Sequence, residues 1–361
     1  MTAYCGVDFH ARQQTVAYCD SLDGEIKLIK LIHDDRESLR RFYTQFQPPV
    51  VVGLEAGGYS DWFERFLEEL GIEPWFGNPT EIRRRARSRQ KNDRRDAELL
   101  LDLLLKGEFP RVYRQHPDSR AVLARLRYRH KLVQLRTKAT NSLHALAIRE
   151  GLTLGSRLLS KQGRLRLMAL PLGEVQAIQR QEWLQVIDHL STHLQRIEQE
   201  LQFLAQKDQV VMRVRTHPGI GVLTGLALVH TLAPISRFQN SRKVAAYIGL
   251  EPREFSSDNK QRWGGISKAG SPLLRFLLVE AAQQAARRDP GLKTAFLRLS
   301  SRRGRSKARV AVARKLLVRA YIMLRDEIDY ATYLRRTVAV GKPAISRDRS
   351  GFPEMPDQLD R

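Results

Sequence analysis

The chain has 361 residues and carries 62 Lys and Arg against 39 Asp and Glu, a formal net charge of +23 at pH 7. This charge exceeds what solubility requires and indicates a polyphosphate partner, most simply a nucleic acid, while the 42% hydrophobic content excludes a merely disordered basic tail. No apolar run reaches the roughly 18 to 20 residues of a membrane span, and the N-terminus lacks a signal-peptide pattern, so we expect a cytoplasmic protein without a membrane partner.

The first hundred residues predict an α/β domain. Short β-rich runs occupy 4–9, 15–20 and 26–33, and an amphipathic helix over 37–46 ends at a Pro-Pro pair. The apolar run 50–55 predicts a covered strand, followed by a helix over 61–70, a strand over 72–76 and one long helix over 79–106. This order matches a ribonuclease H-like (RuvC-like) domain, placed at residues 1–122, although other α/β domains share it.

Four acidic residues lie on predicted strands and on one predicted helix, at positions from which they could converge. Asp8 lies in the first predicted strand, Glu55 ends the fourth, and Asp93 and Asp96 lie three residues apart on one face of the last helix. Carboxylate oxygens are the ligands that Mg²⁺ and Mn²⁺ prefer, and phosphoryl transfer uses such ions. We therefore predict that the four acids hold a catalytic divalent metal.

A simpler interpretation is available for part of this set. Asp93 and Asp96 could form a helical ion-pair patch, or Asp93 could cap the helix with Asp96 at the capping-box position. Asp8 favours the metal site, because an unpaired carboxylate in an apolar strand is costly to bury. We assign the neighbouring Asp61 and Asp102 to helix capping and to the solvated face. The cysteines Cys5 and Cys19 are too few for a zinc site and are expected to be packing residues.

Basic residues surround the acids and continue into the next helix. We predict that they follow a phosphate backbone, although basic solvated faces are also common. Those near the acids are Arg83, Arg84, Arg85, Arg87, Arg89, Lys91 and Arg94, and those on a predicted helix over 123–152 are Arg125, Arg129 and Lys131.

A second helix follows a looser linker over about 151–173. Its apolar residues recur at steps of three and four, as in a coiled coil, at Ile187, Leu190, Leu194, Ile197, Leu201 and Leu204. The seam fits either an intramolecular antiparallel hairpin with the preceding helix or a coiled coil between subunits. Residues 123–207 are thus predicted to form a basic helical and coiled-coil region.

Two glycine-rich segments mark a mainly helical third region, residues 208–330. Gly219 and Gly221 lie in a turn that resembles a helix-hairpin-helix corner, where backbone amides can approach a phosphate, although any tight helical corner can use such a turn. The polar loop 249–271 precedes a helix that begins at Ser271-Pro272, and Arg262 and Lys268 could form an anion site there. The residues alone do not single out a serine in this loop.

Several motifs together resemble a known family. They are GVDFHARQQTVAY, GLEAGGYS, KNDRRDAELL, THPGIGVLTGLAL and RKVAAYIGLEPREFSSDNKQRWGGISKAGSPLLR. The chain resembles DEDD-type insertion-sequence transposases, which are bridge-RNA-guided serine recombinases related to Piv-type DNA invertases. The resemblance implies a RuvC-like domain, a coiled-coil region and a C-terminal transposase domain. It offers no counterpart for the tail, 331–361, which we expect to be disordered from about Tyr330.

The resemblance also implies a mechanism. Ser257 matches the family's nucleophilic serine, with Ser256 as an alternative because the loop is one residue shorter than in some relatives. Attack on DNA would give a covalent 5′-phosphoserine intermediate, with the metal bound by the four acids. The implied partners are DNA at the element ends and target site, a guide RNA, and further copies of the chain in a dimer that assembles to a tetramer. Asparagine precedes Asp93 where many relatives have threonine.

Two alternative functions require fewer of these sequence features. A hydrolytic RuvC-like junction nuclease needs only the four acids and a water nucleophile. A non-catalytic nucleic-acid-binding scaffold would account for the charge and the heptad pattern alone.

Overall fold

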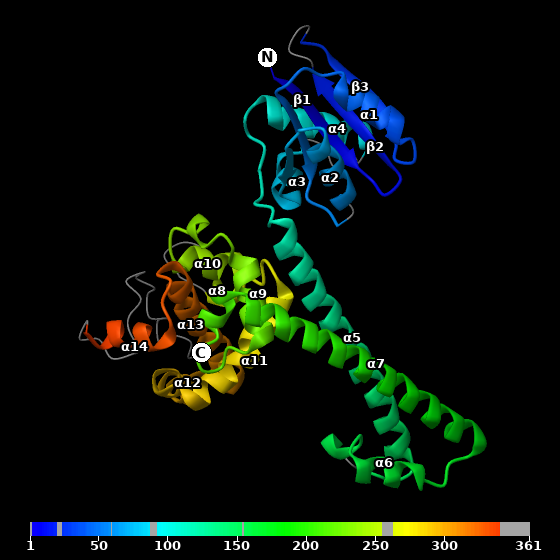
Figure 1. Cartoon of the computed structure of the whole chain (residues 1–361), viewed down its shortest axis with the longest axis vertical. Helices are drawn as coiled ribbons and strands as arrows, with labels where there is room; N and C mark the ends of the chain where they lie inside the picture. Colours follow the sequence, from blue (N-terminus) through cyan, green and yellow to red (C-terminus); the bar gives the residue numbers. More distant parts are fainter. Residues whose placement is uncertain are drawn as a thin grey trace. The chain divides into compact units, whose positions relative to one another are not determined.

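A computed structural model describes residues 2–19, 24–58, 60–86, 92–153, 155–254 and 263–339. The chain divides into two compact units, residues 1–114 and 115–361 (Figure 1). The first is an α/β unit and the second is mainly helical. No helix in the described ranges is long and apolar enough to cross a membrane.

The first unit is built on a mixed five-stranded sheet. Its strands are β1 (Ala3–Phe9), β2 (Gln13–Cys19), β3 (Ile26–Ile32), β4 (Val50–Glu55) and β5 (Pro74–Gly77), in the order β3-β2-β1-β4-β5. β1, β2 and β3 pair antiparallel, whereas β4 runs parallel to β1 and β5 runs parallel to β4. The predicted succession of strands and intervening helices is confirmed.

Helices cover both faces of this sheet. α1 (Arg36–Thr44) and α2 (Asp61–Glu69) pack their aromatic residues on the face to which Cys5 and Val7 point. α4 (Asp93–Leu105) lies on the other face, over β1 and β2. Because side chains alternate along a strand, Gly6 and Asp8 lie on the α4 face. The two cysteines are buried and free, and burial raises the pKa of the Cys5 thiol to about 12, as suits packing residues.

The predicted single helix over 79–106 is wrong. α3 (Pro79–Arg85) ends before Ala86, which is extended, and α4 begins only at Asp93, after an extended Asn92. The Asn92 side chain accepts a hydrogen bond from the backbone amide of Arg94 at 3.1 Å, so asparagine, a preferred N-cap residue, starts the helix. The interpretation of Asp93 as the cap is therefore also wrong, because Asp93 is the first helical residue.

A helical hairpin opens the second unit. α5 (Pro117–Arg149) and α7 (Glu174–Lys207) lie side by side (Figure 1), and Leu126 and Leu132 share a buried cluster with Leu194 and Leu201. The heptad seam is thus buried within the chain, which confirms the intramolecular hairpin alternative. The predicted looser linker is not without structure, since it holds η1 (Gly155–Arg157) and α6 (Lys161–Met168).

The rest of the second unit surrounds one large apolar core. Its elements are α8 (Gln209–Val214), α9 (Val222–Leu232), η2 (Ile235–Arg237), α10 (Ser241–Ile248), β6 (Pro252–Glu254), β7 (Trp263–Ile266), α11 (Pro272–Arg288), α12 (Pro290–Arg303), α13 (Arg305–Arg325) and α14 (Tyr330–Ala339). The predicted start of a helix at Ser271-Pro272 is confirmed, since Ser271 caps α11. The segment predicted as a plain loop instead contains the antiparallel pair β6 and β7.

The prediction of disorder from about Tyr330 is wrong for residues 330–339, which form α14. The Tyr330 ring lies 4.5 Å from that of His217, and its hydroxyl donates to the Asp289 carboxylate. Asp289 also pairs with Arg319, and both side chains are buried. This buried network attaches α14 to the core. The tail beyond it, residues 340–361, lies outside the described residues.

We predict that Asp289→Asn lowers the free energy of unfolding by about 3 to 5 kcal/mol, because it leaves the Arg319 charge buried without a counter-charge. Burial raises the pKa of Asp289, but Tyr330 and Arg319 outweigh it and hold that pKa below its usual 3.8. The contribution of the carboxylate is therefore present above pH 3.8 and is lost as the pH falls through the lower folded pKa.

Urea denaturation of the full chain at several pH values measures this effect. The difference between wild type and Asp289→Asn should be constant near neutral pH and should shrink below about pH 4. A difference that does not change with pH would argue against an ionised Asp289 in this network.

Candidate metal centre

Three side chains of the first unit converge beside the end of β1. His10 Nε2 lies 3.0 Å from Asp8 Oδ2 and 3.5 Å from Asp93 Oδ1. One ligand atom from each of the three residues lies within 4.8 Å of the others. Two carboxylates and an imidazole at this separation are suited to hold a divalent metal ion.

The fold brings these residues together through β1. Asp8 and His10 are two residues apart at the end of a strand, a spacing that places side chains on one face. Gly6 precedes them on the same face, and a Cβ there would lie only 2.5 Å from the carbonyl oxygen of Ala97 on α4. Because Gly6 has no side chain, α4 lies directly on β1, with its first residue beside Asp8.

The electrostatics of Asp8 favour a bound cation. Burial is the main cause that raises the pKa of Asp8, and the charges of Asp96 and Asp93 raise it further. His10 lowers the pKa of Asp8 through its charge and its hydrogen bond. Crowded, partly buried carboxylates are penalised when ionised, and a divalent cation among them would remove that penalty.

The four predicted acids are only partly gathered. Asp8 and Asp93 meet, and Asp96 is close enough to act on the pKa of Asp8. Glu55 ends β4, one position beyond the Val7–Leu54 register pair of β1 and β4. Its carboxylate lies 3.7 Å from Arg83 Nη2 of α3 and is not part of the three-residue cluster. Metal binding by all four acids remains a prediction.

His10 is the residue that the sequence interpretation missed. The signal was present, because the spacing Asp8-Phe9-His10 places aspartate and histidine on one face of a strand end. Histidine in a strand is more often a packing residue, and only the position of Asp93 gives this one a second acidic neighbour.

The basic residues predicted near the acids have local partners. Arg83, Arg84 and Arg94 pair with Glu55, Glu81 and Glu98, and Arg85 donates to the carbonyl oxygen of Glu108. These pairs are largely exposed and therefore weak, so phosphates could replace the carboxylates. The predicted contacts Arg87, Arg89 and Lys91 lie outside the described residues.

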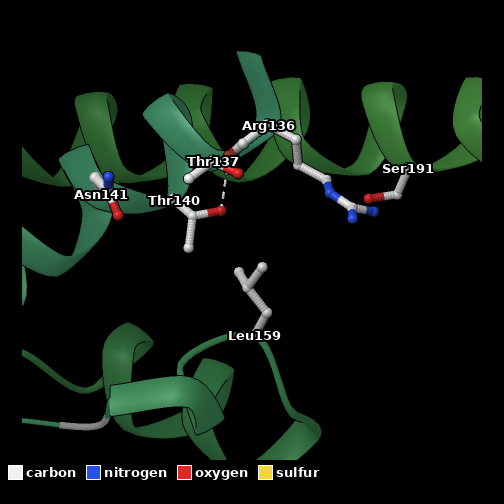
Figure 2. A pocket seen from close by; sticks show the side chains of 6 residues that line it. All are labelled: Arg136, Thr137, Thr140, Asn141, Leu159 and Ser191. Carbon is white, nitrogen blue, oxygen red and sulfur yellow. Dashed lines mark hydrogen bonds between the residues drawn. The ribbon is translucent and has the colours of Figure 1, made fainter. Parts of the chain in front are cut away.

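On the hairpin, the predicted phosphate contacts are also partly engaged. Arg125 and Arg129 of α5 form ion pairs with Glu200 and Glu198 of α7, whereas Lys131 is exposed. Further along, Arg136 extends toward Ser191 in an open cavity of about 410 Å³ (Figure 2). The Ser191 hydroxyl donates to the Ile187 carbonyl of its own helix. The cavity lies in the second unit and includes none of the predicted site residues.

The turn that contains Gly219 and Gly221 packs closely against a neighbouring helix. Gly219 has φ 108°, and a Cβ there would lie 2.6 Å from the backbone nitrogen of Ala285 on α11. Glycine is therefore required because the turn packs against α11, as the alternative of a tight helical corner implies, and a phosphate contact at Gly219 remains a prediction. Gly221 faces open space at the start of α9 and remains a candidate contact.

The predicted serine site can be only partly located. Ser257, Ser256 and Arg262 lie outside the described residues, between β6 and β7. Lys268 is exposed, and its backbone amide donates to the Gly249 carbonyl at 3.2 Å. Its φ of 58° is uncommon for a lysine. The anion-site assignment of Lys268 remains a prediction.

Comparisons with known proteins agree in one description. A transposase model of the IS110-type DEDD domain matches residues 5–148, and a model described as Transposase IS116/IS110/IS902 family matches residues 211–297. The transposase for insertion sequence element IS1111A of Coxiella burnetii is 31% identical over 278 residues, 73% of this chain and 74% of that protein. The transposase for insertion sequence element IS1328 of Yersinia enterocolitica is 31% identical over 240 residues, 65% and 71% of the two chains. A probable family 20 transposase of Pseudomonas aeruginosa is 29% identical over 271 residues, 70% and 75%.

We predict that Asp8→Asn abolishes Mn²⁺ binding and that His10→Ala weakens it roughly 10- to 100-fold, since His10 either binds the ion or orients Asp8. Electron paramagnetic resonance of free Mn²⁺ measures the affinity without any DNA. The control is Asp102→Asn, which removes an exposed carboxylate of the same helix that pairs with Lys106. Unchanged Mn²⁺ affinity in His10→Ala would exclude this histidine from the site.

A second prediction concerns the N-cap of α4. Asn92→Ala should cost about 1 kcal/mol of stability and should weaken Mn²⁺ binding, because the first turn carrying Asp93 and Asp96 loses its cap. Asn92→Thr keeps a capping oxygen and should lie close to wild type in both measurements. If threonine were as damaging as alanine, the cap would not be what positions the two aspartates.

Proposed function

The chain belongs to the IS116/IS110/IS902 family of transposases, and we propose that it cleaves and rejoins DNA through a covalent 5′-phosphoserine on Ser257, aided by a divalent metal. It is a DNA transposase, and its substrate is DNA. The serine, the metal-binding residues, the guide RNA and the oligomeric state are our proposals. The observation that carries the metal-assisted chemistry is the convergence of Asp8, Asp93 and His10.

The architecture of the first unit supports a ribonuclease H-like catalytic domain. Its sheet order is β3-β2-β1-β4-β5, with Asp8 and Glu55 near the ends of adjacent parallel strands. Asp93 and Asp96 lie on the helix that crosses β1. Carboxylates carried by the ends of two strands and by one helix support our proposal that the four acids hold one metal site.

The donor set suits Mg²⁺ or Mn²⁺. Asp8, Asp93 and Asp96 would hold the ion, with Glu55 joining once its carboxylate leaves Arg83. When bound, the ion would stabilise negative charge on the attacking and leaving oxygens of a phosphodiester. His10 would keep the Asp8 carboxylate oriented through its 3.0 Å contact. Arg83, once freed from Glu55, could neutralise a phosphate.

The proposed covalent step involves no net change in the number of phosphate ester bonds. The Ser257 hydroxyl loses its proton and attacks the scissile phosphorus, and the bond to the 3′ oxygen breaks. The 3′ oxygen takes up a proton and leaves as a hydroxyl. The phosphate is then bonded to the Ser257 oxygen and stays attached to the 5′ end of the cleaved strand. Attack by a 3′ hydroxyl on this ester rejoins DNA and restores the serine. Serine is a weak nucleophile that needs such activation.

We propose three kinds of partner: DNA, a guide RNA and further copies of this chain. The net charge of +23 suits phosphate backbones at the element ends and the target site. A guide RNA would read the target by base pairing, which leaves backbone and shape recognition to the protein. Ser257 and the four acids belong to different units of the chain, and we propose that a dimer, assembling to a tetramer, brings them together.

A hydrolytic nuclease is a second candidate, because the whole acidic cluster lies in the first unit, separate in sequence from the serine. Such an enzyme would use water in place of Ser257. The two candidates differ in whether DNA becomes attached to the protein.

We predict that wild-type protein, incubated with Mg²⁺, copurified RNA and DNA from the junction of its element, forms an adduct that mass spectrometry places on Ser257. Ser257→Ala and Asp8→Ala should form none, because one lacks the nucleophile and the other the metal ligand.

Matched controls for this experiment are the adjacent Ser256→Ala and the carboxylate variant Asp102→Asn, which should both form the adduct. An adduct lost only in Ser256→Ala would move the nucleophile by one residue. Cleavage without an adduct, persisting in Ser257→Ala, would establish the hydrolytic nuclease instead.

A further inference from the structure

Helices α12 and α13 carry charges of one sign only, all of them positive. Residues 290–325 contain 11 Lys and Arg and no Asp or Glu, and residues beyond 297 lie outside both segments that match the family models. The basic residues are Lys293, Arg298, Arg302, Arg303, Arg305, Lys307, Arg309, Arg314, Lys315, Arg319 and Arg325.

The geometry concentrates several of these charges at one turn. Gly304 alone joins the two helices, with φ 80°, a backbone conformation that favours glycine. Arg298 lies near the end of α12, and Arg305, Lys307 and Arg309 lie in the first turns of α13. Arg298, Arg305 and Lys307 are exposed and Arg309 is half-buried. We call these four residues the basic turn.

The basic turn differs from several other basic positions in the described part of the chain. Arg125 and Arg129 on the hairpin pair with glutamates, and the buried Arg319 of α13 itself pairs with Asp289. Across the described ranges, the structure pairs none of the four basic-turn residues with a carboxylate. Neighbouring like charges repel one another and destabilise a folded surface, so a polyanion bound here would relieve that repulsion.

We propose that the basic turn binds the phosphodiester backbone of duplex DNA. Proteins that bind single strands stack bases on aromatic side chains, and residues 297–309 include none. Cations on mobile side chains instead neutralise phosphates without reading the sequence. The basic turn thus holds a duplex on the second unit, through residues that take no part in the proposed metal or serine chemistry.

The salt dependence of DNA binding tests this proposal on the full chain. Affinity for 30-base-pair duplexes of two unrelated sequences is measured by fluorescence anisotropy across a KCl series, with EDTA present so that no metal contributes. The variant carries Arg298→Gln, Arg305→Gln, Lys307→Gln and Arg309→Gln. Each lost phosphate contact reduces the magnitude of the negative slope of log affinity against log salt by about 0.9, so we expect a reduction of roughly 3 to 4 with both sequences.

The control variant removes the same charge from exposed positions on α6 and α7, with Lys161→Gln, Arg166→Gln, Arg196→Gln and Lys207→Gln. It should retain the wild-type slope. A second variant without the Arg309 substitution guards against misfolding, since its three changes are all exposed, and it should lose roughly 2 to 3 units of slope. Thermal unfolding of each variant verifies the fold.

An unchanged slope in both basic-turn variants would overturn the proposal. The proposal would also be overturned if the basic-turn variants showed a smaller salt slope with single-stranded RNA and a wild-type slope with duplex DNA. Because the experiment contains no divalent metal and measures no strand cleavage, its result is independent of whether Ser257 forms a covalent intermediate.

Discussion

The candidate metal centre depends on one close backbone contact, between Gly6 of β1 and the α4 helix. A Cβ at Gly6 would lie 2.4 Å from the backbone nitrogen of Leu101, and one at Gly53 of β4 would lie 2.9 Å from the Leu104 side chain. The helix therefore lies on a strip of the sheet that lacks side chains, closer than any larger residue would permit. This contact fixes the direction of α4, and with it the position of Asp93 beside Asp8.

The same arrangement explains the charge balance of the site. Asp8 is on the face covered by α4, so burial raises its pKa, and the carboxylates brought by α4 raise it further. His10 at the strand end partly offsets this effect. Around the site, Arg83 and Arg94 are held by nearby glutamates, whereas cations of the basic turn have no acid on their own helices. Acids concentrated at one edge of a sheet and cations left unbalanced elsewhere together suit an enzyme that handles phosphate chains.

The fold of the first unit could be predicted from the sequence because its signals are local. Apolar runs and their alternation locate the strands, and these gave the element order correctly. The prediction of one helix over 79–106 fails because arginines are good helix formers and hide the break, whereas Asn92 caps α4 and starts a separate helix. The prediction for the tail fails for a different reason, since the tilted ring contact between Tyr330 and His217 joins residues far apart in the sequence.

The sequence by itself determined the net charge, the alternation that places Asp8 and Gly6 on one face of β1, and the spacing of Asp93 and Asp96 on one helix face. These properties follow from composition and from the periodicity of strands and helices. Only the tertiary structure decided that His10 joins the aspartates, that Arg83 pairs with Glu55, and that the heptad seam is buried inside a hairpin. Each of these is a contact between separate elements, and the packing of elements against one another, not local periodicity, selects such contacts.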